Sequence, residues 1–240
     1  MSSLRRRISM ALREKVLRHY LIPSNRYGVP EGLVRALPPS RPISLVDVGA
    51  HSGDFTTSIR NHAGLTRALV VEPQPARCKA LLERLGGKGV EVAECALSDH
   101  EGYEDLEVLN WDYSSSLLPL LRQDDSIHWG LDLGLRERIR CRVRTLDDLL
   151  LEVDWTEAID LLKVDVQGAE MLVLRGAERT LPRVRMVFVE VSFRPLYEGA
   201  AVFEEVYALL RENGLRMLSM EEGFRGTDGE LLQADALFSR

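Results

Sequence analysis

A carboxylate and two glycines stand together at a predicted strand-to-helix turn, where a ligand could be bound. Asp47 is followed by Gly49 and Gly53, with His51 between the glycines. Glycine lets the backbone approach a ligand closely, and a helix that begins there offers free N–H groups. The turn lacks the G-x-G-x-x-G pattern that binds a dinucleotide pyrophosphate. A carboxylate beside the turn suits the cationic S-adenosylmethionine (SAM) better than it suits a dinucleotide. We expect His51 to serve there as a polar turn residue. The simpler alternative is a tight turn that binds no ligand.

Two further carboxylates end the next two predicted strands. Glu72 follows an apolar run, about 20 residues after the glycine turn, where a carboxylate accepts the ribose hydroxyls of a nucleotide. Asp99 ends the third strand and is placed to accept a hydrogen bond from an adenine amino group. The alternatives are a solvated strand-end glutamate and a turn-forming aspartate. The spacing favours a nucleoside-containing cofactor.

A charged segment interrupts a later strand that should be apolar. Lys163 and Asp165 are two residues apart and therefore share one face of the strand, while Glu170 falls in the first turn of the next helix. Glu190 ends the following strand. Methyl transfer from a sulfonium to an alcohol requires a group that takes up the hydroxyl proton, which a carboxylate can do. We predict these four residues as the catalytic group, with Asp165 the first candidate for the base and Glu190 the second.

The elements that must position these side chains alternate from residue 43 onward between short β-branched runs and helix-length amphipathic stretches. This alternation predicts an α/β fold with a largely parallel sheet. Predicted strands over 215–220 and 231–238 flank a turn at 226–229, which indicates a C-terminal antiparallel hairpin. Residues 101–144 give a mixed signal, and we expect them to form a lid or an insertion.

The composition bounds the class of protein. The chain has 240 residues, of which 45% are hydrophobic, and this predicts one globular domain over residues 41–240. Its net charge of −6 gives no overall positive potential that would attract nucleic acid. No apolar run is long enough to span a membrane and no secretory signal is evident, so we expect a cytoplasmic protein. The three cysteines have neither ligand nor disulfide spacing, and we predict no metal.

Residues 1–40 are expected to form a basic amphipathic helix, over residues 3–20, and a linker. Apolar side chains recur there every fourth residue: Leu4, Ile8, Leu12 and Val16. Such a helix either packs on the domain and its cleft or contacts an anionic membrane surface, as a peripheral protein at the inner face of the membrane. Six basic residues are few for membrane attachment, which favours packing on the domain.

Five segments together resemble the FkbM-type methyltransferases: residues 46–53, 71–75, 96–99, 162–170 and 190–192. The resemblance covers about residues 43–240 and implies a Rossmann-like class I methyltransferase, with a mostly parallel seven-stranded sheet and helices on both faces. It implies SAM-dependent O-methylation of natural products, sugars or polysaccharides. It places Asp47, Gly49 and Glu72 at cofactor positions, Asp99 at the adenine position, and Lys163, Asp165 and Glu170 in the family signature. His51 stands where the family usually has Asn.

Three alternatives remain beside a SAM-dependent methyltransferase that acts on a small-molecule or glycan hydroxyl. A nicotinamide oxidoreductase shares the fold, but it should carry the dinucleotide glycine pattern. A non-catalytic binding module gives no reason for four carboxylates to converge on the strand ends. A magnesium-dependent O-methyltransferase would use Asp165 and Glu190 as oxygen ligands. The sequence leaves the acceptor and the oligomeric state open.

Overall fold

The computed structural model describes most of the chain after its first segment: residues 29–37, 41–87, 89–121 and 132–240. The predicted amphipathic helix over residues 3–20, whether it packs on the domain or contacts a membrane, lies outside the described residues. Within the described residues, no helix combines the length and apolar character needed to cross a membrane.

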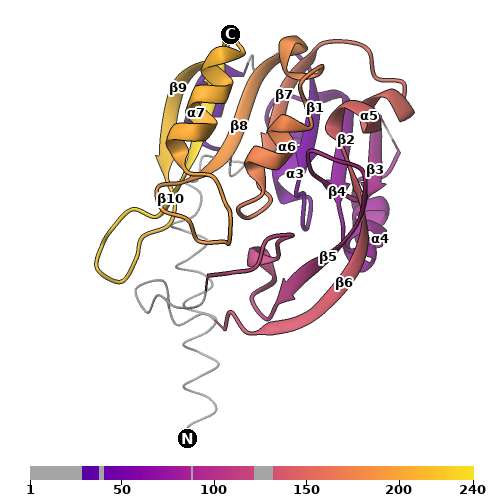
Figure 1. The fold of residues 1–240 in the computed structure, drawn as a ribbon. Helices are drawn as coiled ribbons and strands as arrows, with labels where there is room; N and C mark the ends of the chain where they lie inside the picture. Colours follow the sequence, from indigo (N-terminus) through magenta and orange to yellow (C-terminus); the bar gives the residue numbers. More distant parts are fainter. Residues whose placement is uncertain (1–28, 38–40, 88, 122–131) are drawn as a thin grey trace, which may run out of the picture.

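Seven strands form the central sheet: β1 (Ile43–Val48), β2 (Leu65–Glu72), β3 (Val90–Glu94), β7 (Ile159–Val164), β8 (Val184–Ser192), β9 (Arg216–Glu222) and β10 (Gln233–Ser239). Their order across the sheet is β3-β2-β1-β7-β8-β10-β9 (Figure 1). The first five in that order pair in parallel, whereas β10 is antiparallel to both β8 and β9. The predicted α/β class, the seven-stranded sheet and the C-terminal antiparallel hairpin are confirmed.

Helices cover both faces of this sheet: α2 (Glu31–Ala36), α3 (Asp54–His62), α4 (Pro75–Leu85), α5 (Leu146–Glu152), α6 (Glu170–Arg175) and α7 (Phe203–Glu212). Leu33, Ile59 and Leu81 of α2, α3 and α4 pack with one face, and the buried side chains of α5, α6 and α7 pack with the other. A sheet covered on both sides has strands buried throughout, which is why β1 reads as a continuous apolar run. The polar exceptions in β1 are Ser44 and Asp47, both of which are buried.

A second, three-stranded sheet occupies much of the region predicted as a lid or insertion. Strands β5 (Gly102–Leu109) and β6 (Leu135–Arg144) form an antiparallel pair, and β4 (Ala96–Leu97) joins β6 in parallel. In Figure 1 this pair curves away from the main sheet. Arg138 and Arg140 pair there with Glu107 and Asp105 of β5, so these opposite charges stabilise the pair across the strands.

Helix α2 belongs to the packed domain, although the sequence analysis placed its residues in a linker. Leu33 is fully buried, and the backbone N–H of Gly32 donates to a carboxylate oxygen of Glu221 in β9 at 2.8 Å. A side chain at residue 32 would collide with Ser219, so glycine allows the close approach. The domain core therefore begins before residue 41.

Candidate functional site

The site lies where the chain changes direction across the sheet. From β1 the chain first adds β2 and β3 on one side, and it returns to β7 on the other side of β1. Open α/β sheets bind ligands at such a switch point, outside the carboxyl ends of the strands. Gly49 has a φ of +74°, and a Cβ on it would lie 1.8 Å from the carbonyl oxygen of Asp165. Glycine is required there because the two strand ends touch.

An open cavity lies at this edge, with about 680 Å³ of empty space that is continuous with solvent. Its polar lining includes Gly49, His51, Glu72, Asp165 and Gln167. The other residues that line the cavity are mainly apolar and include Ala96 and Leu97 of β4. The cavity therefore joins three of the six predicted cofactor residues, Gly49, His51 and Glu72, to one of the predicted catalytic carboxylates.

Glu72 is arranged as a hydrogen-bond acceptor for a ligand in the cavity. Its side chain is buried, and its two oxygens accept the backbone N–H groups of His51 at 2.9 Å and Gln74 at 3.0 Å. Burial raises the pKa of Glu72, and these backbone hydrogen bonds oppose that rise. Each carboxylate oxygen keeps a second lone pair, so Glu72 can still accept two hydroxyl groups. This is the donor and acceptor pattern that a ribose diol needs.

His51 links the glycine turn to the second sheet. Its φ of +51° is unusual for a residue with a side chain, and its ring stacks on that of Tyr113 with centroids 3.9 Å apart. Tyr113 lies in the short 3-10 helix over Asp112–Ser114, and both rings line the cavity. The predicted lid region thus reaches the cofactor side of the cavity through an aromatic contact.

Asp47 and Lys163 brace the turn from behind the cavity. Asp47 accepts the hydroxyl of Thr56 at 2.6 Å, and Lys163 Nζ lies 3.4 Å from carboxylate oxygens of both Asp47 and Asp165. The same Nζ donates to the carbonyl oxygen of Gly49 at 2.8 Å. Burial alone would lower the pKa of Lys163, but Asp165 and Asp47 outweigh it and raise the pKa. Lys163 therefore stays charged and ties the two strand ends together.

Besides Asp47, two further predicted cofactor residues, Gly53 and Asp99, do not line the cavity. Gly53 adopts φ +76° at the start of α3, where a Cβ would collide with Leu81 and Leu85, so its role is in packing. Asp99 bonds to His100 Nδ1 at 2.9 Å and its side chain is 38% exposed. At the place expected for Asp99, the cavity is lined instead by apolar residues that include Leu97.

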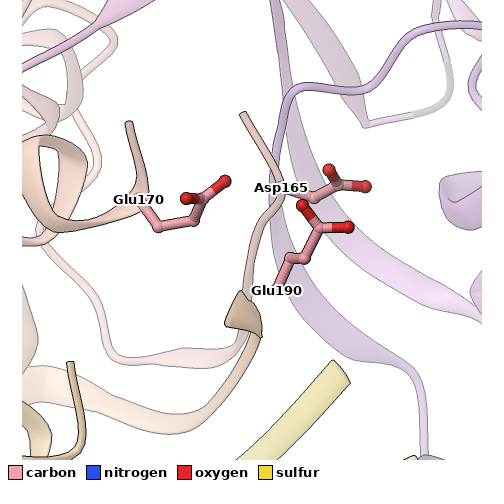
Figure 2. Close-up of side chains that lie close together, drawn as sticks. All are labelled: Asp165, Glu170 and Glu190. Carbon is pink, nitrogen blue, oxygen red and sulfur yellow. The ribbon is translucent and has the colours of Figure 1, made fainter. Parts of the chain in front are cut away.

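Three of the predicted catalytic residues meet in one carboxylate cluster. Asp165, Glu170 and Glu190 each bring an oxygen within 4.8 Å of the other two (Figure 2). Glu170 is buried, and its oxygens accept backbone N–H groups of Val166 and Gly168 at 2.9–3.1 Å, which fixes the loop after β7. Burial raises the pKa of Glu170 to about 7 and that of Glu190 well above its ordinary value. Like charges this close cannot all ionise, so the cluster retains protons at neutral pH.

Four residues that the sequence analysis did not single out complete the cluster: Gln167, Tyr197, Gln233 and Asp235. The side-chain amide of Gln167 donates to Asp165 and Glu190, and that of Gln233 donates to Glu190 at 2.8 Å. Asp235 lies directly opposite Glu190 on β10, and burial followed by the charge of Asp165 raises the pKa of Asp235 to about 7. The position of Gln167, between Asp165 and Gly168 in the charged segment, is the one local signal that could have found any of them.

The cluster is suited to handling a proton. Carboxylate oxygens are also the ligands that Mg²⁺ prefers. However, Glu170 already binds the backbone, Glu190 accepts two amide groups, and Asp165 is paired with Lys163. With its side chain 39% exposed and its place in the cavity lining, Asp165 is the member that an acceptor molecule can reach.

Comparison with known proteins finds similar chains among the methyltransferases. A family model described as the methyltransferase FkbM domain matches residues 47–217. The 2-O-methyltransferase NoeI of Sinorhizobium fredii is 28% identical over 88% of this chain and 86% of its own length. The 31-O-demethyl-FK506 methyltransferase FkbM of Streptomyces tacrolimicus is 30% identical over 76% of each chain. The crystal structure of methyltransferase FkbM from Methylobacillus flagellatus shares the fold, with a TM-score of 0.56 and 14% identity, over 93% of this chain and 57% of that one.

Proposed function

This chain belongs to the FkbM family of SAM-dependent methyltransferases, and from that premise we propose that it methylates a hydroxyl oxygen of a small-molecule or glycan acceptor. The observation that carries the proposal is Asp165, a carboxylate at the cavity wall beside the cofactor residues. Two relatives named for O-methylation, NoeI and FkbM, support an oxygen acceptor.

The residues present fit the cofactor. Glu72 has two free acceptor positions for the ribose hydroxyls, and Gly49 lines the cavity, where the backbone of the turn could approach the amino-acid tail. The apolar wall around Leu97 suits the adenine ring. Bound SAM would supply a methyl group on a positively charged sulfur. His51 and Tyr113 would help to exclude water from that part of the cavity.

In the proposed reaction, Asp165 accepts the hydroxyl proton while the oxygen takes the methyl group. The O–CH₃ bond forms as the S–CH₃ bond breaks, the sulfur keeps the electron pair, and S-adenosylhomocysteine leaves. Glu190 is the weaker candidate for the base, because burial raises its pKa well above its ordinary value and its Oε2 atom already accepts two amide groups. Lys163 stays beside Asp165 and holds that carboxylate against the end of β7. A positioned base of this kind contributes about 10²–10⁴-fold to rate.

The proposal is tested in two stages with the full chain. Calorimetric titration with SAM and with NADH first establishes the cofactor, and we expect heat of binding from SAM alone. Transfer of a labelled methyl group is then measured on a panel of hydroxylated sugars and natural products, beside matched amines and carboxylic acids. Methylation of hydroxyls supports the proposal. Methylation confined to amines or acids would contradict the acceptor class, and binding of NADH alone would contradict the cofactor.

A further inference from the structure

Gln167 lies between the two carboxylates that are the candidates for the base. Its Nε2 atom donates to Asp165 Oδ1 at 2.9 Å and to Glu190 Oε2 at 3.0 Å. A primary amide has two N–H groups, so both of its donors are used by these two carboxylates. Gln167 also lines the cavity, which places this bridge beside the acceptor space.

The direction of the Gln167 amide is fixed from its other end. The hydroxyl of Tyr197 lies 3.2 Å from Gln167 Oε1 and 3.1 Å from the carbonyl oxygen of Ser114. Burial and then the charge of Glu190 raise the pKa of Tyr197 well above its ordinary value, so the hydroxyl remains a neutral donor. The single proton of that hydroxyl is shared between these two oxygens. Its donation to Oε1 requires the same amide orientation as donation from Nε2 to the two carboxylates.

The backbone at Gln167 is held in an unusual conformation by its neighbours. Its φ is +58°, which costs free energy for a residue with a side chain and persists where the surroundings enforce it. The hydroxyl of Ser116 donates to the carbonyl oxygen of Gln167 at 2.6 Å. A Cβ on the next residue, Gly168, would lie 2.7 Å from the Tyr197 ring, so that ring packs directly against the loop.

These contacts connect the segment after β5 to the carboxylate cluster. Leu120 forms a bridge with Tyr197, and the N–H of Glu198 donates to the carbonyl oxygen of Pro119 at 2.8 Å. Ser114 and Ser116 of the same segment contact Tyr197 and Gln167. Residues from the predicted lid region, the loop after β7 and the loop after β8 therefore meet at one amide.

We propose that Gln167 is a positioning residue for methyl transfer: its amide holds Asp165 in place for the acceptor hydroxyl and links it to Glu190 and to the segment that covers the cavity. The proposal rests on the proposed function, since it assigns Asp165 the proton. With the amide removed, Asp165 Oδ1 loses the one hydrogen-bond donor that the described residues give it. Displacement of a reacting group by about 1 Å costs up to about 10²-fold in rate.

The test compares Gln167→Leu with Gln233→Leu as the matched control, using the acceptor that the methyl-transfer panel identifies. Both variants remove an amide that donates to Glu190 Oε2, but only that of Gln167 also contacts Asp165. We expect Gln167→Leu to lower kcat about 10- to 100-fold with the SAM dissociation constant and acceptor KM changed less than threefold. Gln233→Leu should lower kcat much less. Equal losses of kcat in both variants, or full activity of Gln167→Leu, would overturn the proposal.

A milder variant guards against a folding defect in Gln167→Leu. Tyr197→Phe keeps the ring on Gly168 and removes the hydroxyl that orients the amide. Tyr197→Phe should lower kcat by a smaller factor than Gln167→Leu does, and its melting temperature should be unchanged. Normal kcat in Tyr197→Phe, together with a misfolded Gln167→Leu, would count against the proposal.

A second measurement needs no acceptor and separates this proposal from the function on which it rests. The chain has four glutamines, so side-chain amides labelled with ¹⁵N give few signals, which Gln→Leu variants assign. Asp165→Asn should move the Gln167 amide signals and leave those of Gln233 in place. Unmoved Gln167 signals would overturn the bridge even in an active enzyme. Moved signals in a protein that binds no SAM would retain the bridge and reject the proposed function.

Discussion

The two halves of the site satisfy their buried carboxylates in different ways. In the cofactor half, Glu72 accepts hydrogen bonds from the backbone N–H groups of His51 and Gln74. Gln74 is two residues further along the chain, and His51 follows the neighbouring strand β1. In the proton-handling half, Glu190 is held by the side chains of Gln167 and Gln233, which come from separate elements. Backbone donors survive most substitutions, whereas side-chain donors do not. The second half should therefore be the more sensitive to single substitutions.

The largest effect expected concerns the proton. Asp165→Asn keeps the shape of the side chain and removes its ability to take up the hydroxyl proton. We expect kcat for methyl transfer to fall about 10²–10⁴-fold, while calorimetry shows SAM affinity within about threefold of wild type. Asp160→Asn, at the opposite end of β7 from Asp165, is the control and should retain kcat. Loss of SAM affinity equal to the loss of rate would show that the two halves are not separable.

The contact between the halves can be broken at Gly49. Gly49→Ala introduces a Cβ 1.8 Å from the carbonyl oxygen of Asp165 at a φ of +74°. We expect the free energy of unfolding to fall by about 2–5 kcal/mol, from backbone strain and overpacking together. Gly87→Ala is the matched control, because Gly87 has a φ of +77° with open space around its Cβ position. Denaturant titration that gives equal losses for both variants would contradict a tight contact between strand ends.

A pH-dependent effect on stability is expected in the proton-handling half. The pKa of Asp235 is raised from 3.8 to about 7, chiefly by burial. A carboxyl group with a raised folded-state pKa contributes stability that is present below pH 3.8 and is lost as the pH rises through 7. Asp235→Asn does not titrate, so its melting temperature should exceed that of wild type by about 2–6 °C at pH 8. The advantage should shrink toward pH 5, and an advantage independent of pH would contradict the assignment.

The smallest effect expected is that of a chelator. The oxygens of the carboxylate cluster are engaged by Lys163, Gln167, Gln233 and backbone N–H groups. We therefore predict that EDTA changes the rate of methyl transfer by less than about twofold, because a base needs no metal to accept the proton. Loss of activity that added Mg²⁺ restores would favour the metal-dependent alternative and assign Asp165 and Glu190 as its ligands.

The sequence predicted the features that depend on local pattern. Apolar runs gave the strands, the two glycines marked the turn after β1, and charges at strand ends marked Glu72 and Asp165. Each of these signals lies within a few residues of the feature that it predicts. The alternation of strands and helices then brings the strand ends to one edge.

Asp99 shows where reasoning from strand ends reaches its limit. The third predicted strand was expected to end at Asp99, at the cofactor edge of the sheet. In the structure β3 stops at Glu94, and Ala96 and Leu97 pair with β6 in the second sheet. The chain leaves the main sheet before Asp99, whose carboxylate pairs with His100. Pairing with a distant strand is a long-range choice that a local pattern does not contain.

The partners of the carboxylate cluster were beyond prediction for a related reason. Tyr197 and Gln233 lie 30 and 66 residues from Gln167 along the chain. They reach the cluster because β8 and β10 are neighbours in the sheet and because the loop after β8 packs on the loop after β7. In the sequence, Asp235 is a single charged residue within a predicted strand. It lies opposite Glu190 because of the register in which β10 pairs with β8.

The most direct test of the account is calorimetric titration of SAM into wild type, Glu72→Gln and Glu94→Gln. Glu72 and Glu94 end neighbouring strands, but Glu94 is exposed and outside the cavity lining. The account predicts that Glu72→Gln weakens SAM binding about 10- to 100-fold, since hydrogen bonds to a charged group contribute about 1.5–3 kcal/mol. Glu94→Gln should bind SAM as wild type does. Unchanged affinity in a folded Glu72→Gln variant would contradict the placement of the cofactor at this edge of the sheet.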